Sequence, residues 1–87
     1  MDSYRVEWKR SAVKELKALS KEMAGRILRA VEELPVNPYP VGARKLVGSE
    51  RTYRIREGDY RVIYTVAAST LIIEVIRVGH RKEVYDR

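Results

Sequence analysis

The stretch Thr52–Tyr64, TYRIREGDYRVIY, consists of two alternating runs on either side of Gly58–Asp59. A two-residue connection with glycine at its first position is typical of a tight β-hairpin. A loop of this length places Arg56 opposite Arg61, whereas a three-residue loop would mix arginines with the apolar set. The two-residue loop therefore predicts one apolar face and one arginine face. The apolar face holds Tyr53, Ile55, Val62 and Tyr64, and the other face holds Arg54, Arg56 and Arg61.

The arginine face has two interpretations. Like charges directly opposite each other on a hairpin are destabilising, by a few tenths to about 1 kcal/mol. Arginine is also the side chain best suited to bind phosphate through two parallel hydrogen bonds. The alternative is a solvated face on which Glu57, Asp59 and Glu74 serve as counter-charges. The hairpin alone leaves both interpretations open.

The run Thr70–Val78 is almost continuously apolar and β-branched. Such a run predicts an inner strand that is covered on both faces. The segment Gly79–Tyr85 follows it and brings an imidazole, two cations and a phenol to the end of that strand.

The first third of the chain predicts one strand and two helices. Ser3–Trp8 alternates like a half-buried strand. Ser11 and Ser20 stand where helix N-caps are expected, and Pro35 stops the second helix. The apolar stripe of the resulting helical hairpin must cover the apolar sheet face. The stripe consists of Ala12, Val13, Leu16, Leu19, Ala24, Ile27, Leu28, Val31 and Leu34.

The segment Pro35–Glu50 contains all three prolines and two glycines, and is expected to be the main irregular connection. It is longer than a typical loop of about 4–6 residues, which in a compact domain indicates a binding role or partial ordering. Arg44 and Lys45 lie in it, shortly before the hairpin.

Composition limits the function further. The 87 residues form one small domain, 1–87. Eighteen basic against twelve acidic residues give a charge of +6, which favours a polyanionic partner. The absence of cysteine and the single histidine argue against a zinc site or a two-histidine ribonuclease site. No apolar run is long enough to span a bilayer and the N-terminus lacks a signal-peptide pattern, so we expect a cytoplasmic protein without a membrane partner.

The hairpin YRIREGDYRVIY followed by IRVGHRKEVY resembles the RelE family of toxins from toxin–antitoxin pairs, within the RelE/ParE superfamily. The resemblance implies an α+β fold in the order β-α-α-β-β-β, with the helical hairpin packed on one face of a small, mainly antiparallel twisted sheet. It also implies a ribosome-dependent endoribonuclease that cleaves mRNA in the ribosomal A site and inhibits translation. The implied partners are an acidic, helical RelB-like antitoxin, the ribosome and mRNA.

Metal-independent RNA cleavage begins when the substrate's own 2′-hydroxyl attacks the adjacent phosphate, and it requires proton transfer and stabilisation of phosphoryl charge. Arginine suits only the second task, because its pKa exceeds about 12. The candidate proton carriers are Tyr85, His80, Lys82 and Glu57, although a structural role at the strand end fits His80 slightly better than proton transfer.

The resemblance implies catalytic roles for five residues. Well-known members carry lysines where this chain has Arg54 and Arg56. Arginine at these two places preserves phosphate binding but argues against a mechanism in which a lysine acts as the general base. No cofactor or metal is implied. The catalytic set is Arg54, Arg56, Arg61, Arg81 and Tyr85, and the residues expected to bind RNA are Arg44, Lys45, Arg51, His80 and Lys82.

Two alternatives remain. One is a ParE-like toxin that acts on DNA gyrase and cleaves no RNA. The set of Arg61, Arg81 and Tyr85 is typical of the ribonuclease branch, and this favours the RelE assignment. The other alternative is a non-catalytic RNA-binding module, which would bind RNA in a salt-sensitive way and cleave it in no context.

Overall fold

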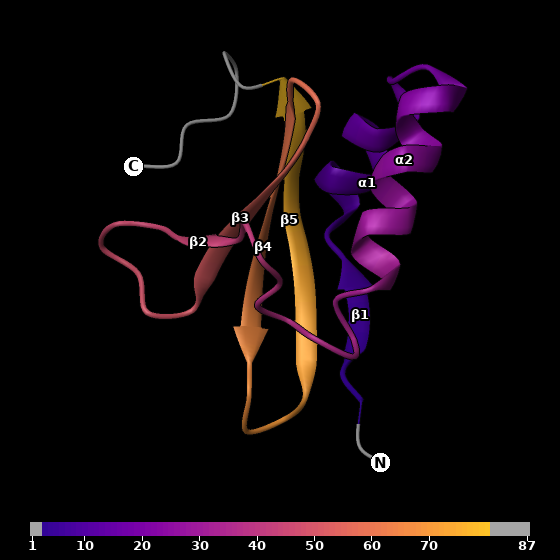
Figure 1. Cartoon of the computed structure of the whole chain (residues 1–87). Helices are drawn as coiled ribbons and strands as arrows, with labels where there is room; N and C mark the ends of the chain where they lie inside the picture. The colour runs from indigo at the N-terminus through magenta and orange to yellow at the C-terminus, as the bar shows by residue number, and fades with distance from the viewer. Residues whose placement is uncertain (1–2, 81–87) are drawn as a thin grey trace.

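The computed structural model describes residues 3–80 of the chain. Two helices cover one face of a five-stranded sheet in an α+β arrangement (Figure 1). The elements follow one another as β1 (Arg5–Trp8), α1 (Arg10–Lys17), α2 (Lys21–Glu32), β2 (Arg44–Lys45), β3 (Thr52–Glu57), β4 (Tyr60–Ala67) and β5 (Ile72–His80).

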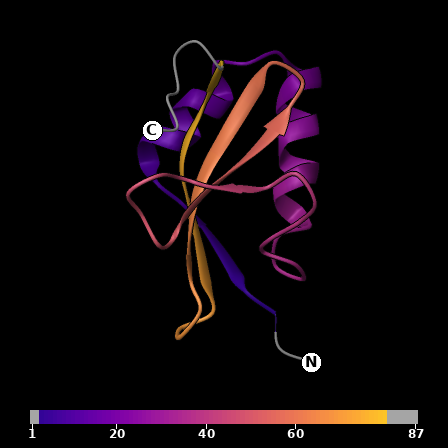
Figure 2. The ribbon, with the colours of Figure 1, turned by 60° about the vertical axis from the view of Figure 1, so that its left-hand side comes forward.

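The strands lie in the order β1-β5-β4-β3-β2. Only β1 runs parallel to its neighbour, β5, and the other three pairings are antiparallel. The expectation of a helical hairpin on one face of a mainly antiparallel sheet is therefore confirmed. In Figure 2 the segment that contains β2 crosses in front of the longer strands at a steep angle to them.

The predicted hairpin register is confirmed. Arg56 pairs with Arg61 across β3 and β4, and Arg54 pairs with Ile63. The turn depends on Gly58, whose φ of 62° lies in the region that glycine adopts without a steric penalty. This register turns the apolar side of the hairpin towards the helices.

The core lies between the helices and that face of the sheet. Ile27, Val31 and Leu34 of the second helix and its C-terminal turn are buried against the strands, where Val62 and Tyr64 are fully buried. Leu28, which was expected in the apolar stripe, is instead 39% exposed. The three buried residues already fill the contact with the sheet, and Leu28 lies at the margin of the stripe, one position away from Ile27.

The cap predicted at Ser20 is confirmed, because its hydroxyl accepts a hydrogen bond from the Met23 amide at 3.2 Å. The cap predicted at Ser11 is wrong, since the first helix begins at Arg10 after Lys9 and has no side-chain cap. The start of the helix is set by contact with the sheet. The Lys9 amide donates to Val75 O on β5 at 2.9 Å, and the helix begins immediately after that bond.

The connection Pro35–Glu50 is less irregular than expected, because it contains the two-residue strand β2. Arg44 and Lys45 of this strand pair with Arg54 and Tyr53 of β3. Two residues are too short for an alternating pattern, so the sequence gives no sign of the strand.

The inner position of β5 is confirmed, but its expected covering on both faces is wrong for the described part of the chain. No described helix lies on its second face, where Ile72 and Glu74 are half-buried and Arg77 is exposed. A β-bulge at Ile76 explains the misleading apolar run. Ile73 and Val75 face the core before the bulge and Val78 faces it afterwards, so the alternation changes phase within the strand.

Candidate nucleic-acid interface

Four arginines on three neighbouring strands share the sheet face that is turned away from the helices. Register defines this set. Arg44 of β2 lies opposite Arg54 of β3, and Arg56 of β3 lies opposite Arg61 of β4. Arg54 and Arg56 are two residues apart and therefore point to the same side of the sheet. We refer to these four residues as the arginine face.

Burial differs strongly within the arginine face. Arg54 is only 8% exposed, which is unusual for a charged side chain, whereas Arg44 and Arg56 are exposed and Arg61 is half-buried. Arg61 lies opposite Gly79 on β5. Because glycine has no side chain, the space beside the Arg61 guanidinium is not filled from that position. Within residues 3–80, neither Arg44 nor Arg56 forms an ion pair with a carboxylate.

A hollow of about 310 Å³ adjoins three of these arginines. It is lined by Val41, Gly42, Arg44, Arg54, Ile55 and Arg56. The turn at Val41–Gly42 was not predicted as part of a site, although its position shortly before Arg44 is a usable signal. Because β2 consists only of Arg44 and Lys45, it pairs with β3 no further than Arg54. The edge of β3 beyond Arg54 is therefore open to this hollow.

The chemistry of the arginine face is that of an anion site. Guanidinium groups on adjacent strands repel one another, and a bound phosphate would relieve this repulsion while accepting several charge-assisted hydrogen bonds. The same groups cannot take up a proton at physiological pH. The arginine face can therefore hold and stabilise phosphoryl charge, and proton transfer requires other residues.

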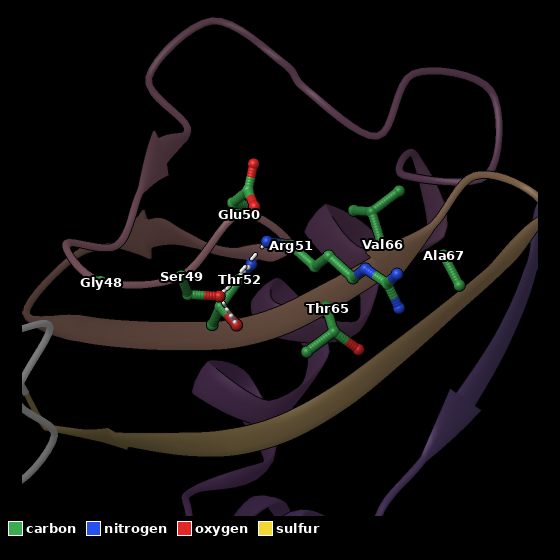
Figure 3. A pocket seen from close by; sticks show the side chains of 8 residues that line it. All are labelled: Gly48, Ser49, Glu50, Arg51, Thr52, Thr65, Val66 and Ala67. Atoms are coloured by element: carbon green, nitrogen blue, oxygen red, sulfur yellow. Dashed lines mark hydrogen bonds between the residues drawn. The ribbon is translucent and has the colours of Figure 1, made fainter.

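The remaining predicted residues are divided between the two sides of the sheet. Lys45 pairs with Tyr53 and so belongs to the helix side by register. His80 also lies on the helix side, where its ring makes an edge contact with Tyr60 at 5.6 Å between centroids. Arg51 precedes β3 and lines a separate pocket at the other end of the sheet (Figure 3).

Glu57 has a structural partner. Arg26 of α2 donates to its carboxylate from Nε at 3.0 Å and approaches it with a second nitrogen at 2.9 Å. This ion pair joins the second helix to the hairpin turn and lies on the helix side. Trp8 and Tyr53 are partly buried and pack against the hydrophobic core.

Arg81, Lys82 and Tyr85 lie outside the residues that the structure describes. Among the described residues there is no cluster of three or more histidine, aspartate and glutamate side chains that could hold a metal ion. Residues 3–80 also contain no helix that is long and apolar enough to cross a membrane.

Comparison with known proteins assigns the chain to one family of proteins. Residues 6–85 match the family model described as the ParE toxin of the type II toxin–antitoxin system parDE. Toxin RelE3 of Methanocaldococcus jannaschii is 34% identical over 86 residues, covering 94% of this chain and 96% of the relative. The chain therefore belongs to the ParE/RelE family of toxins of type II toxin–antitoxin systems.

Solved structures point to the RelE members of that family. The archaeal RelE–RelB complex from Pyrococcus horikoshii matches with a TM-score of 0.81 and 34% identity, over 93% of this chain and 98% of that chain. The intact Escherichia coli RelBE toxin–antitoxin complex matches with a TM-score of 0.78 and 26% identity, over 88% and 95%. The fold of this chain is thus the RelE fold.

Proposed function

We propose that this protein is a metal-independent endoribonuclease toxin that cleaves mRNA in the ribosomal A site and is neutralised by a RelB-like antitoxin. The observation that carries the proposal is the arginine face. Four guanidinium groups from β2, β3 and β4 share one sheet face. Like charges in this arrangement destabilise the fold, whereas the same groups can bind the phosphates of a single RNA strand. The similarity to proteins named RelE supports the same assignment.

In the proposed reaction the 2′-hydroxyl of the substrate attacks the adjacent phosphate and the 5′-oxygen leaves. Arg61 and its neighbours on the arginine face stabilise the negative charge that develops on the phosphoryl oxygens. Two of the four candidate proton carriers are turned to the helix side, namely Glu57 in its ion pair with Arg26 and His80 against Tyr60. Tyr85 and Lys82 therefore become the leading candidates for proton transfer.

Such a limited set of chemical groups suits a ribosome-dependent enzyme. Holding the 2′-hydroxyl in line with the phosphate can contribute about 7–11 kcal/mol of the barrier. In this proposal the ribosome supplies that orientation and the toxin supplies charge and proton transfer. The expected antitoxin is acidic, because a partner that covers a face of this +6 protein gains from complementary charge.

Primer extension on mRNA in programmed ribosomes tests the proposal. The wild-type protein should produce cleavage within the A-site codon. The same cleavage is expected when polyamines keep the ribosome intact and Mg²⁺ is lowered to the minimum that the ribosome needs. An Arg61→Ala variant should produce little cleavage. Addition of the antitoxin should suppress the wild-type activity. Intact mRNA with folded wild-type protein would overturn the assignment as a ribonuclease.

A second candidate function has one specific observation in its favour. The family model that matches residues 6–85 carries the description of the ParE toxin. A gyrase-directed toxin would inhibit DNA supercoiling by gyrase and leave ribosome-bound mRNA intact. Running the supercoiling assay beside primer extension separates the two candidates, because each predicts activity in only one of the assays.

A further inference from the structure

A second polar pocket lies at the far end of the same sheet, about 570 Å³ in volume. It is formed by the turn Gly48–Arg51, the start of β3 at Thr52, and the end of β4 at Thr65–Ala67 (Figure 3). The Arg51 side chain extends from the turn towards Thr65 and Ala67, so a cation lies over the hydroxyl-bearing part of the pocket.

Register connects this pocket to the arginine face. Thr52 lies directly opposite Thr65, and Thr52 is two residues before Arg54. The two threonines therefore belong to the same side of the sheet as the arginines, roughly 7 Å further along the strands. A chain lying along β3 and β4 can contact the arginine face and then this pocket without leaving that side.

Arg51 is not neutralised within the described residues. No described carboxylate lies within ion-pair distance of it, although Glu50 is its neighbour and Glu74 lies opposite Thr65 on β5. Figure 3 shows the Glu50 carboxylate directed away from the guanidinium. Within the described residues the Arg51 guanidinium therefore has no carboxylate partner and can bind an external anion.

The hydroxyl groups around Arg51 are organised by Ser49. Its Oγ accepts hydrogen bonds from the amides of Arg51 at 3.2 Å and Thr52 at 3.1 Å, and donates to Thr52 Oγ1 at 2.7 Å. This fixes the turn and leaves the hydroxyl proton of Thr52 free to donate elsewhere. The pocket thus offers a guanidinium and the hydroxyls of Thr52 and Thr65, which are donors that phosphate oxygens accept.

We propose that this pocket is a second phosphate-binding subsite, which holds the backbone of a single RNA strand one or two nucleotides beyond the arginine face. The inference rests on the proposed function, because it extends the track of the same substrate. Glu74 of β5, which lies opposite Glu7 of β1, borders the track on its far side, whereas Glu7 is paired with Arg5. The charge of Glu74 disfavours phosphate beyond β4.

Fluorescence anisotropy with 2′-O-methyl RNA, which cannot be cleaved through its 2′-oxygen, tests the subsite. The probes are a dinucleotide, whose single phosphate can occupy only one of the two sites, and an oligonucleotide of about 12 nucleotides, a length within the range that single-stranded binding domains cover. The variants are Arg51→Gln and Arg51→Lys, with Arg29→Gln on α2 as the control that makes the same charge change on the helix side. Equal melting temperatures ensure that folded proteins are compared.

Arg51→Gln should weaken binding of the longer RNA by about tenfold, in line with loss of one charge-assisted contact. The slope of log affinity against log salt should become shallower by about 0.7. Arg51→Lys should recover part of the loss, and dinucleotide binding should be unchanged in all variants. Arg29→Gln should have little effect on either probe.

Other outcomes separate the subsite from the proposed function. If Arg51→Gln binds the longer RNA as tightly as Arg29→Gln does, while the wild type still cleaves mRNA on ribosomes, the subsite is wrong and the proposed function stands. If the wild type neither binds RNA nor cleaves it, both are wrong. If Arg51→Gln weakens binding of a polyglutamate peptide but not of RNA, the pocket serves an acidic protein and the subsite is again wrong.

Discussion

Arg54 is the most deeply buried charge on the arginine face. It is 8% exposed, and its strand neighbours on the arginine face are Arg44 and, two residues along, Arg56. Burying a charge removes it from water, which disfavours the folded state unless partners or a ligand compensate. Arg54 is not without a partner in the fold, and a phosphate bound at the arginine face would compensate its charge further.

Arg61 is the arginine whose loss should affect catalysis most clearly. Replacing it by alanine removes charge stabilisation at the phosphate and should reduce A-site cleavage by about 10²–10³-fold, the usual effect of deleting one such donor. Quantitative primer extension on programmed ribosomes measures the change. Arg29→Ala on the helix side should cleave at the wild-type rate. An Arg61→Ala variant of full activity would remove the arginine face from the active site.

Arg56 offers the matching test of stability. It is exposed, lies opposite Arg61, and has no ion pair within residues 3–80. Arg56→Ala should lower cleavage and raise the free energy of unfolding by a few tenths to about 1 kcal/mol, because the like-charged pair is relieved. Urea unfolding measures this. Arg56→Lys keeps the charge and should show no gain, so a gain in both variants or in neither would contradict the explanation.

At this scale the sequence predicts the arginine face well, because a period of two and a two-residue turn determine which side chains share a face. It predicts less for Lys45 and His80. The face of Lys45 depends on β2, a strand too short to recognise, and that of His80 depends on a bulge earlier in β5. The ion pair of Glu57 could not be predicted from the sequence, because its partner Arg26 lies 31 residues away.

Among the elements, β5 shows how a helix can complete a sheet. The parallel strand β1 pairs with β5 only as far as Val75, which leaves the edge of β5 beyond that point without a strand. Glu15 of α1 fills the gap. Its carboxylate accepts from the Val78 amide at 2.8 Å and from Arg77 Nε at 3.3 Å.

Two substitutions at Glu15 distinguish these two bonds. Glu15→Ala leaves the Val78 amide without its acceptor and should lower the free energy of unfolding by about 1–3 kcal/mol. Glu15→Gln keeps an acceptor oxygen and loses only a partly exposed ion pair, which is worth about 0–1 kcal/mol. Urea unfolding of both variants measures the difference. Equal losses would mean that the ion pair, not the amide bond, is what stabilises this edge.

The elements were predicted as far as local pattern determines them. Ser20 could be recognised as a cap because both its sequence context and its structure are local. Ser11 could not be excluded, since the start of α1 is set by a backbone bond from Lys9 to a strand that lies 66 residues later in the chain. The strand β2 and the bulge in β5 likewise result from pairing between distant segments.

For the molecule as a whole, the sheet separates two tasks. The helix side carries the packed core and the ion pairs of Glu15 and Glu57, and the other side carries the arginine face. The connection from the helices leads to β2 at the edge of the sheet, and a cluster of tyrosines contacts it. Tyr39 contacts Tyr53 at 5.0 Å between ring centroids, and Tyr53 stacks on Tyr64 at 6.0 Å.

The most buried member of that cluster supplies the bond that ties the connection to the sheet. Tyr64 is fully buried, and its hydroxyl donates to Pro38 O at 2.6 Å. Burial is the main cause that raises the pKa of Tyr64 above its ordinary value of 10.0, and the neighbouring Tyr53 raises it further. An ionised phenolate could not donate this bond, so the folded protein holds the proton more strongly than the unfolded chain does.

This difference predicts a loss of stability at high pH. Because the folded pKa of Tyr64 exceeds the unfolded value, its contribution is complete below about pH 10 and declines as the pH rises above it, by up to about 1.4 kcal/mol per pH unit. Tyr64→Phe removes the ionisable group and should cost about 1 kcal/mol at neutral pH through loss of the hydrogen bond. Urea unfolding of both proteins from about pH 7 to pH 11 should show the wild-type advantage shrinking and then reversing, because only the wild type loses the contribution of this phenol. A difference between the two proteins that stays constant across this range would show that Tyr64 does not hold its proton more tightly in the folded state, and the bond to Pro38 would then need another explanation.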